Sequence, residues 1–92
     1  MNIIWTGEAQ ADRHRIWMFT AERTVERADR IDARLTERVN SLIGVPGQGR
    51  PAGPTRRDLS ITDIQLVVRY RIDDDAIRIL QVWHTKENRE AP

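Results

Sequence analysis

The sequence predicts an α+β fold in which a two-helix hairpin packs on one face of a mainly antiparallel sheet. Three observations support this. A short β-branched run opens the chain, apolar residues then recur at helical spacing, and after a Gly/Pro-rich loop they alternate with polar ones. Helices and strands that occur in separate blocks are typical of α+β proteins. The expected order is one strand, two helices and three antiparallel strands (β-α-α-β-β-β).

The first strand and the first helix are expected within the first twenty residues. Residues 2–6 form a β-branched and aromatic run that favours a strand. Thr6 is a candidate helix cap, and Glu8 places an acid near the helix N-terminus. The helix is expected from about Ala9 to Thr20, with four residues on a loose apolar face: Ala9, Ile16, Trp17 and Phe19.

The second helix has the clearest periodicity in the chain. It is expected from Thr24 to Ile43, and Gly44 follows where a helix would end. A short link at 21–23 would join the two helices into a hairpin. Apolar residues recur at spacings of three and four, which predicts an amphipathic helix: Ala28, Ile31, Leu35, Val39 and Leu42.

Strands are expected after the Gly/Pro loop at 45–54. Three segments fit: 57–61, 64–72 and 76–83, with a turn at Asp73-Asp74-Asp75 between the last two. In 64–72 the residues Leu66, Val68, Tyr70 and Ile72 would share the helix-covered face. Arg69 and Arg71 would then lie on the opposite face, which is expected to stay open.

Composition limits the classes of function. A chain of 92 residues makes one domain (1–92), and residues 86–92 form a polar tail. The net charge of +1 argues against a dedicated nucleic-acid binder, although 14 of the 15 basic residues are arginine. The chain has no cysteine, no signal-like leader and no apolar run of membrane-spanning length. We therefore expect a cytoplasmic protein.

No motif predicts a metal, a cofactor or a catalytic set. Gly44-x-x-Gly47-x-Gly49 lacks the context of a phosphate loop, and His14 and His84 have no ligand-like spacing. Arg69 and Arg71 allow two interpretations. In the first, they bind phosphate or a carboxylate-rich partner. In the second, one of the aspartates Asp58, Asp63 and Asp73 neutralises them. His84 directly follows the last strand and is either functional or structural.

Three motifs in the second half resemble the RelE/ParE toxins of type II toxin–antitoxin systems. The ParE-like members of that family carry Arg-Glu-Leu, Tyr-Arg-Val and Ile-Leu-x-Val-x-His strands in this order. Here they correspond to Arg57-Asp58-Leu59, Tyr70-Arg71-Ile72 and Ile79-Leu80-Gln81-Val82-Trp83-His84. The first half is similar in layout, so the resemblance covers nearly the whole chain.

The resemblance implies a gyrase-binding toxin more than a ribonuclease. RelE-like members cut messenger RNA on the ribosome with basic residues, one of them three positions before the strand Tyr. That position is Val67 here, the central loop has Arg50 and no lysine, and Tyr70 is the only tyrosine. ParE-like members trap DNA gyrase, which requires a binding surface and no catalytic set. Enzymatic activity is therefore not expected.

The resemblance also implies the partners. A ParD-like antitoxin with a ribbon-helix-helix domain would bind the toxin in a hetero-oligomer, and operator DNA would be reached only through it. Candidate antitoxin contacts are Ile16, Trp17, Leu35 and Val39. Candidate target contacts are Arg57, Arg69, Arg71, Trp83, His84 and Arg89.

Two alternatives to the gyrase-directed toxin remain open. One is a ribosome-dependent endoribonuclease whose site is rearranged around Arg69, Arg71 and His84. The other is a non-toxic protein of the same fold that only binds a partner.

Overall fold

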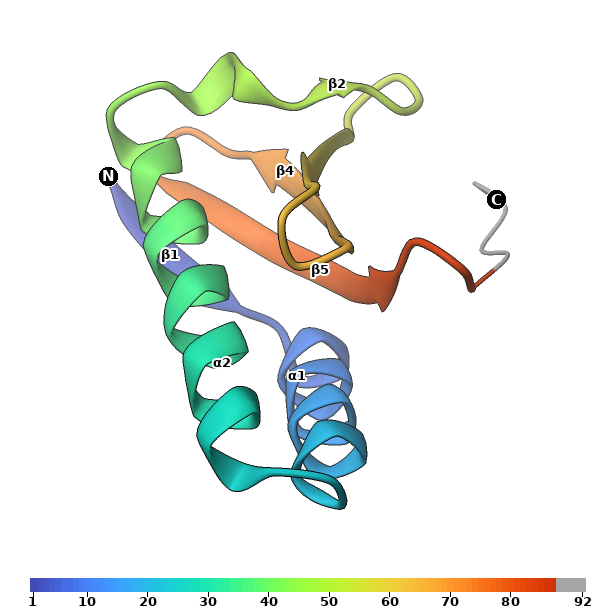
Figure 1. The fold of residues 1–92 in the computed structure, drawn as a ribbon. Coiled ribbons are helices and arrows are strands. Elements are labelled where there is room, and N and C mark those ends of the chain that lie inside the picture. Colours follow the sequence, from blue (N-terminus) through green and yellow to red (C-terminus); the bar gives the residue numbers. More distant parts are fainter. Residues whose placement is uncertain (88–92) are drawn as a thin grey trace.

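The computed structural model describes residues 1–87, in which a helical hairpin packs on one face of a mixed sheet (Figure 1). The strands lie in the spatial order β1-β5-β4-β3-β2. The elements follow the chain as β1 (Asn2–Trp5), α1 (Gly7–Ala21), α2 (Val25–Asn40), the 3₁₀ helices η1 (Ser41–Ile43) and η2 (Pro46–Gln48), β2 (Arg50–Pro51), β3 (Arg57–Ile61), β4 (Leu66–Ile72) and β5 (Ala76–His84).

The predicted α+β architecture is confirmed, with two differences in the sheet. β1 pairs with β5 in parallel, whereas the other pairings are antiparallel. In addition, the Gly/Pro loop contains the two-residue strand β2, in which Arg50 pairs with Asp58 and Pro51 with Arg57. Two residues are too few to show alternation, so the sequence pattern did not reveal this strand.

Both helices begin at a threonine cap. The Thr6 hydroxyl accepts the Ala9 N–H at 3.2 Å, and the Thr24 hydroxyl accepts the Arg27 N–H at 3.2 Å. Each hydroxyl thereby satisfies a backbone donor that the first helical turn leaves free. The second helix reaches Ile43 as predicted, but its last turn is the 3₁₀ helix η1.

The core lies between the hairpin and the sheet. The helical part comes mainly from Leu35 and Val39 of α2 and from Leu42 of η1, whereas the fully buried apolar contribution of α1 is Ala9. The sheet side consists of alternate residues of the last three strands: Leu59, Ile61, Leu66, Val68, Tyr70, Ile77, Ile79 and Val82. The alternation predicted for β4 is therefore confirmed for Leu66, Val68 and Tyr70, whereas Ile72 at the end of the strand is 40% exposed and does not join the core.

A bulge in β5 keeps its apolar residues on the core side. Tyr70 is opposite Ile79 but Arg69 is opposite Gln81, which leaves Leu80 without a partner in the β4 ladder. The extra residue shifts the alternation of β5 by one position. As a result Ile79 and Val82, three positions apart, both pack into the core.

Asp12 of α1 supports the second half of β5. The pairing of β1 with β5 ends at Trp5 and Ile79, so later residues of β5 have no strand on this side. Asp12 is 7% exposed, and its carboxylate accepts the Val82 N–H at 2.9 Å. A helix side chain thus satisfies a backbone donor that a neighbouring strand would otherwise bind.

Within residues 1–87, neither helix is both long enough and apolar enough to span a bilayer.

Candidate functional site

The helix-free face of the sheet holds three of the six predicted target-binding residues. Strand register places Asp58, Arg69 and Gln81 side by side across β3, β4 and β5. One step along, Val67 is opposite Trp83. In the other direction, Arg71 is opposite Arg78. The spacing in the sequence therefore brings Arg69, Arg71 and Trp83 to one face.

Arg69 is enclosed in this face. Its side chain donates to both carboxylate oxygens of Asp58, at 2.8 and 3.0 Å, and its guanidinium carbon lies 4.9 Å from the centre of the Trp83 ring. Arg69 and Trp83 are only 2% and 6% exposed. The hydrogen bonds to Asp58 raise the pKa of Arg69 despite its burial, so the pair is held as ions.

The expectation that Arg69 and Trp83 lie open to a partner is therefore wrong. For Arg69 the second interpretation is confirmed: an aspartate, Asp58, neutralises its charge. One guanidinium nitrogen, Nη1, is buried and has no hydrogen-bond partner among residues 1–87. Such a group destabilises the fold unless the ion pair and the Trp83 contact compensate for it.

Arg71 is also paired, but it remains accessible. It donates to Asp73 at 2.9 Å, and Arg78 donates to the same carboxylate at 2.5 Å. The side chains of Arg71 and Arg78 are 42% and 38% exposed. Hydrogen bonds from Arg71 and then Arg78 hold the pKa of Asp73 below its ordinary value. Asp63 instead pairs with Arg34 of α2, at 2.8 Å.

Arg57 and Tyr70 support the loop before β2. The Arg57 side chain donates to the Gly49 carbonyl at 2.7 Å. The buried Tyr70 hydroxyl donates to the Pro46 carbonyl at 2.7 Å and accepts the Gly49 N–H at 2.8 Å. Burial raises the pKa of this hydroxyl above its ordinary value, although the Gly49 bond and the Arg57 charge oppose the rise.

A basic groove lies where β4 ends beside the β2–β3 loop. Its volume is about 510 Å³, and Arg56, Arg57 and Arg71 line it together with Asp73. Apolar atoms come from Pro51, Pro54 and Ile72. Two sequence-predicted target residues, Arg57 and Arg71, thus meet at one site, and no sequence motif distinguished Arg56 as a third.

His84 takes part in the turn that follows β5. Its ring nitrogen Nδ1 accepts the Lys86 N–H at 3.1 Å, and its own N–H donates to the Glu87 carboxylate at 3.1 Å. It lies beyond Trp83 in β5, away from the basic groove. Arg89, another predicted target contact, lies outside the described residues.

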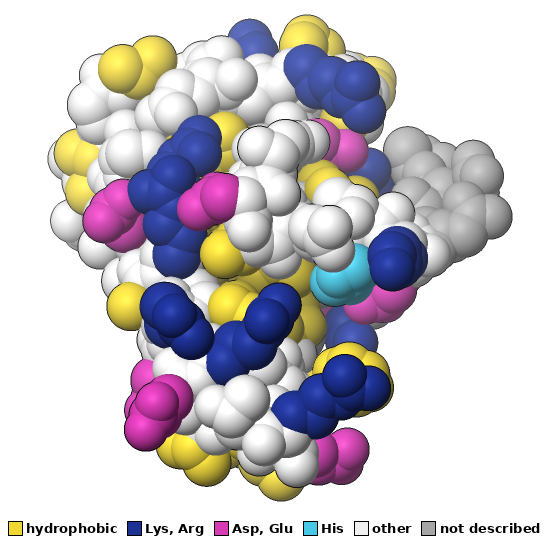
Figure 2. Space-filling view, viewed as in Figure 1, with side chains coloured by type: hydrophobic (Ala, Val, Ile, Leu, Met, Phe, Trp, Pro, Cys, Tyr) yellow, Lys and Arg dark blue, Asp and Glu magenta, His cyan; other side chains and the backbone are white. Residues whose placement is uncertain are grey.

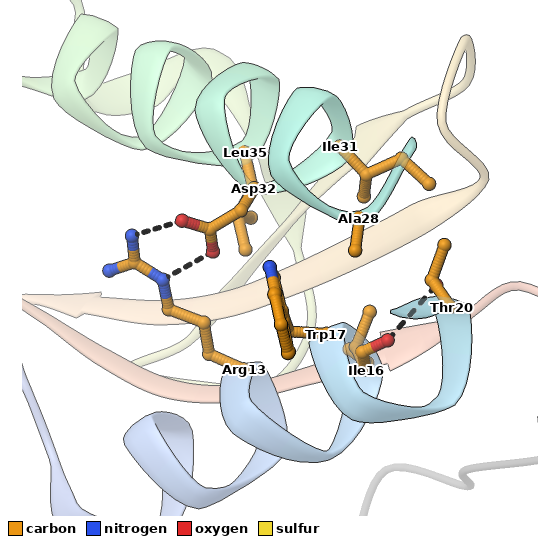
Figure 3. A pocket seen from close by; sticks show the side chains of 8 residues that line it. All are labelled: Arg13, Ile16, Trp17, Thr20, Ala28, Ile31, Asp32 and Leu35. Carbon is orange, nitrogen blue, oxygen red and sulfur yellow. Dashed lines mark hydrogen bonds and ion pairs between the residues drawn. The ribbon is translucent and has the colours of Figure 1, made fainter. Parts of the chain in front are cut away.

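The four predicted antitoxin contacts are buried or half-buried within the fold. Leu35 and Val39 are core residues, 1% and 0% exposed, so a partner could reach them only if α2 left the sheet. This corrects the expectation for these two residues, because the apolar face of α2 is already covered by β-strands. Ile16 and Trp17 are half-buried between the helices (Figure 3).

The hairpin itself is tightly closed. Arg13 of α1 binds both carboxylate oxygens of Asp32 in α2, at 2.7 and 2.8 Å (Figure 3). The Trp17 indole donates to Asp29 at 2.9 Å. The space left between the helices is only about 10 Å³, too small for a side chain of a partner.

Exposed apolar residues lie near the end of the hairpin instead. Phe19 is 72% exposed, and Met18 and Val25 are 50% and 53% exposed. Sequence reasoning placed Phe19 on the buried face of α1. Its spacing of seven from Asp12 and three from Ile16 puts it on the same side of a 3.6-residue helix as these residues, so helical periodicity could not have identified its exposure.

The comparisons with known proteins agree with this fold. Residues 3–89 match the model of the family described as the ParE toxin of the type II toxin–antitoxin system parDE. The chain is 34% identical to Toxin RelE1 of Caulobacter vibrioides over 89 residues, covering 95% of this chain and 96% of that protein. Toxin RelE2 of the same organism is 30% identical over 82 residues, covering 89% and 92%.

A solved structure shares the architecture. It is described as the chromosomal ParDE TA system from P. aeruginosa, and it superimposes with a TM-score of 0.81 at 25% identity. The match covers 91% of this chain and 95% of that one. The chain therefore belongs to the ParE toxin family of type II toxin–antitoxin systems, within the RelE/ParE superfamily.

Proposed function

We propose that this toxin acts by binding DNA gyrase and that it does not cut RNA. The family establishes a toxin whose partner is an antitoxin. It leaves the target open, because the relatives named above are called RelE while the family model is called ParE. The choice between the two mechanisms rests on the chemistry of this chain.

The proposal rests on three positions, Val67, Arg69 and Tyr70, at which no polar group is free to act on RNA. Cleavage of RNA requires a base, an acid and a cation that are free to contact the phosphate. Here Arg69 is buried against Asp58 and Trp83, and the Tyr70 hydroxyl is bound to the loop backbone. Val67 occupies the position at which RelE-like toxins carry an arginine. These three positions support a binding role over a catalytic one.

The antitoxin surface is proposed to include the exposed end of the hairpin. Met18, Phe19 and Val25 expose apolar side chains that solvent alone would not favour. Ile16 and Trp17 lie on the same hairpin but are half-buried, and they would contact an antitoxin only at their exposed edges. A ParD-like antitoxin that lays an apolar helix or strand here would cover this area.

The target is tested with purified components. The chain is added to DNA gyrase and supercoiled plasmid, and double-strand breaks trapped in the gyrase–DNA complex are measured after protease treatment. In parallel, the chain is added to translating ribosomes, and messenger RNA ends are mapped by toeprinting. Samples mixed with the antitoxin first serve as the matched control.

We expect trapped gyrase complexes that the antitoxin abolishes, and no new RNA ends. Codon-dependent RNA ends that disappear with His84→Ala would overturn the proposal in favour of the ribonuclease. If a folded chain gave neither product and expression left growth unchanged, the non-toxic alternative would replace it. The gene beside this one should encode a small protein with a ribbon-helix-helix start.

A further inference from the structure

We propose that the basic groove formed by Arg56, Arg57 and Arg71 binds a carboxylate-rich peptide segment of a partner protein. The segment carries acidic side chains next to at least one apolar side chain. The inference stands apart from the choice of target, because it concerns the chemistry of the groove and would hold for a toxin with either mechanism.

The groove is open and large enough for several side chains. It occupies about 510 Å³ between the β2–β3 loop and the end of β4. All three arginines are only partly buried, and Ile72 is 40% exposed. In Figure 2, basic side chains gather over β2 and the loop that follows it.

Positive charge in the groove exceeds negative charge. Among residues 1–87, no carboxylate pairs with Arg56 or Arg57, and Arg57 is bonded to the neutral Gly49 carbonyl. Arg71 shares Asp73 with Arg78, so this one carboxylate serves two guanidinium groups. Guanidinium groups present paired donors that match the two oxygens of a carboxylate.

The lining of the groove favours a peptide over a nucleic acid. Sites for single-stranded nucleic acid combine cationic grooves with aromatic rings on which bases stack. Among the residues that the structure describes, no aromatic side chain lines this groove, and its uncharged surface comes from Pro51, Gly53, Pro54, Thr55 and Ile72. Proline and isoleucine suit an aliphatic side chain between acidic ones.

The test measures fluorescence anisotropy with the full chain at low ionic strength. The probe is a labelled peptide of alternating glutamate and leucine, and the comparison peptide replaces each glutamate with glutamine. Labelled oligothymidine of matched length tests the nucleic-acid alternative. The groove variant is Arg56→Glu, because Arg56 lines the groove and forms no ion pair with a carboxylate among residues 1–87. The control is Arg30→Glu, on the exposed surface of α2.

We expect Arg56→Glu to weaken binding of the glutamate peptide about tenfold, because one attraction becomes a repulsion. Arg30→Glu should change it less than about twofold. A lysine–leucine peptide should bind Arg56→Glu better than it binds the unaltered chain. Added salt should weaken the binding of the glutamate peptide more than the binding of the glutamine peptide.

Three outcomes would overturn the inference. The first is equal binding of the glutamate and glutamine peptides, and the second is an equal loss in Arg56→Glu and Arg30→Glu. The third is tighter binding of oligothymidine, which would make the groove a nucleic-acid site. Circular dichroism and urea unfolding establish that the variants are folded. Should Arg56→Glu unfold, Arg56→Gln replaces it, with a loss of about threefold expected.

Discussion

Arg69 and Arg71 lie two positions apart on the same strand and the same face, yet their surroundings differ. Arg69 is enclosed by Asp58 and the Trp83 ring and is 2% exposed. Arg71 is paired with Asp73 at the end of the strand, with its side chain 42% exposed. An arginine on a helix-free sheet face is therefore a binding residue only where its acidic partner leaves it accessible.

The position of each acid explains the difference. Asp58 is directly opposite Arg69 on the neighbouring strand, so the pair lies in the middle of the sheet with Trp83 beside it. Asp73 belongs to the turn after β4, where solvent reaches the pair. The middle of the face is thus a part of the fold, and its end is an open cationic surface.

The largest expected effect is a difference in the stability that the protein loses when each of the two arginines is replaced by alanine. Arg69→Ala should lower the free energy of unfolding by about 3–5 kcal/mol, because it leaves Asp58 charged and unpaired in a buried site. Arg71→Ala should lower it by at most about 1 kcal/mol, since its ion pair is exposed to solvent. Urea denaturation of both variants measures the difference, and equal losses would contradict the distinction.

A second effect tests how closely the loop beside the groove packs against Tyr70 and Asp58. A Cβ added at Gly49 would lie 2.8 Å from the Tyr70 ring and hydroxyl and 2.9 Å from the Asp58 carbonyl. Gly49→Ala should therefore destabilise the protein by about 1–3 kcal/mol, because packed neighbours must move.

Gly47→Ala is the matched control, since a Cβ there meets nothing within 4 Å. Its free energy of unfolding should change by less than about 0.5 kcal/mol. The pair of variants is compared by urea denaturation. If both variants lost the same stability, backbone freedom in the loop would matter more than contact with Tyr70.

Much of the fold follows from local patterns, but the accessibility of the site does not. Alternation in β4 assigns Arg69 and Arg71 to one face, and it names the candidate aspartates. It does not tell which arginine is buried, because that depends on the register between β3 and β4 and on Trp83 from a third strand. These are contacts between segments that are distant in the sequence, and local spacing does not predict them.

The helices show the same limit. The spacing of Leu35 and Val39 identified an apolar face, yet it gave no sign that strands of the same chain already cover it. Asp12 is a further case, because an acid in a charged helix gives no hint that it binds the backbone of β5. In each case the sequence predicts the face, and the structure decides what occupies it.

The smallest effect concerns Asp73, which limits how freely Arg71 binds a ligand. The pKa of Asp73 is below its ordinary value in the folded protein, so its stabilising contribution exists above the ordinary carboxyl range. That contribution is lost as the pH falls through the lowered pKa. Asp73→Asn should thus be less stable than the unaltered chain at pH 7, and the difference should shrink below about pH 4.

The same variant acts in the opposite direction on binding, which distinguishes the groove from the buried pair. Without the Asp73 charge, Arg71 is free for an incoming carboxylate, so Asp73→Asn should bind the glutamate–leucine peptide more tightly at pH 7. Asp74→Asn, at an exposed position in the same turn, controls for the change in net charge. Equal gains in the two variants would mean that net charge, and not release of Arg71, determines the affinity of the groove.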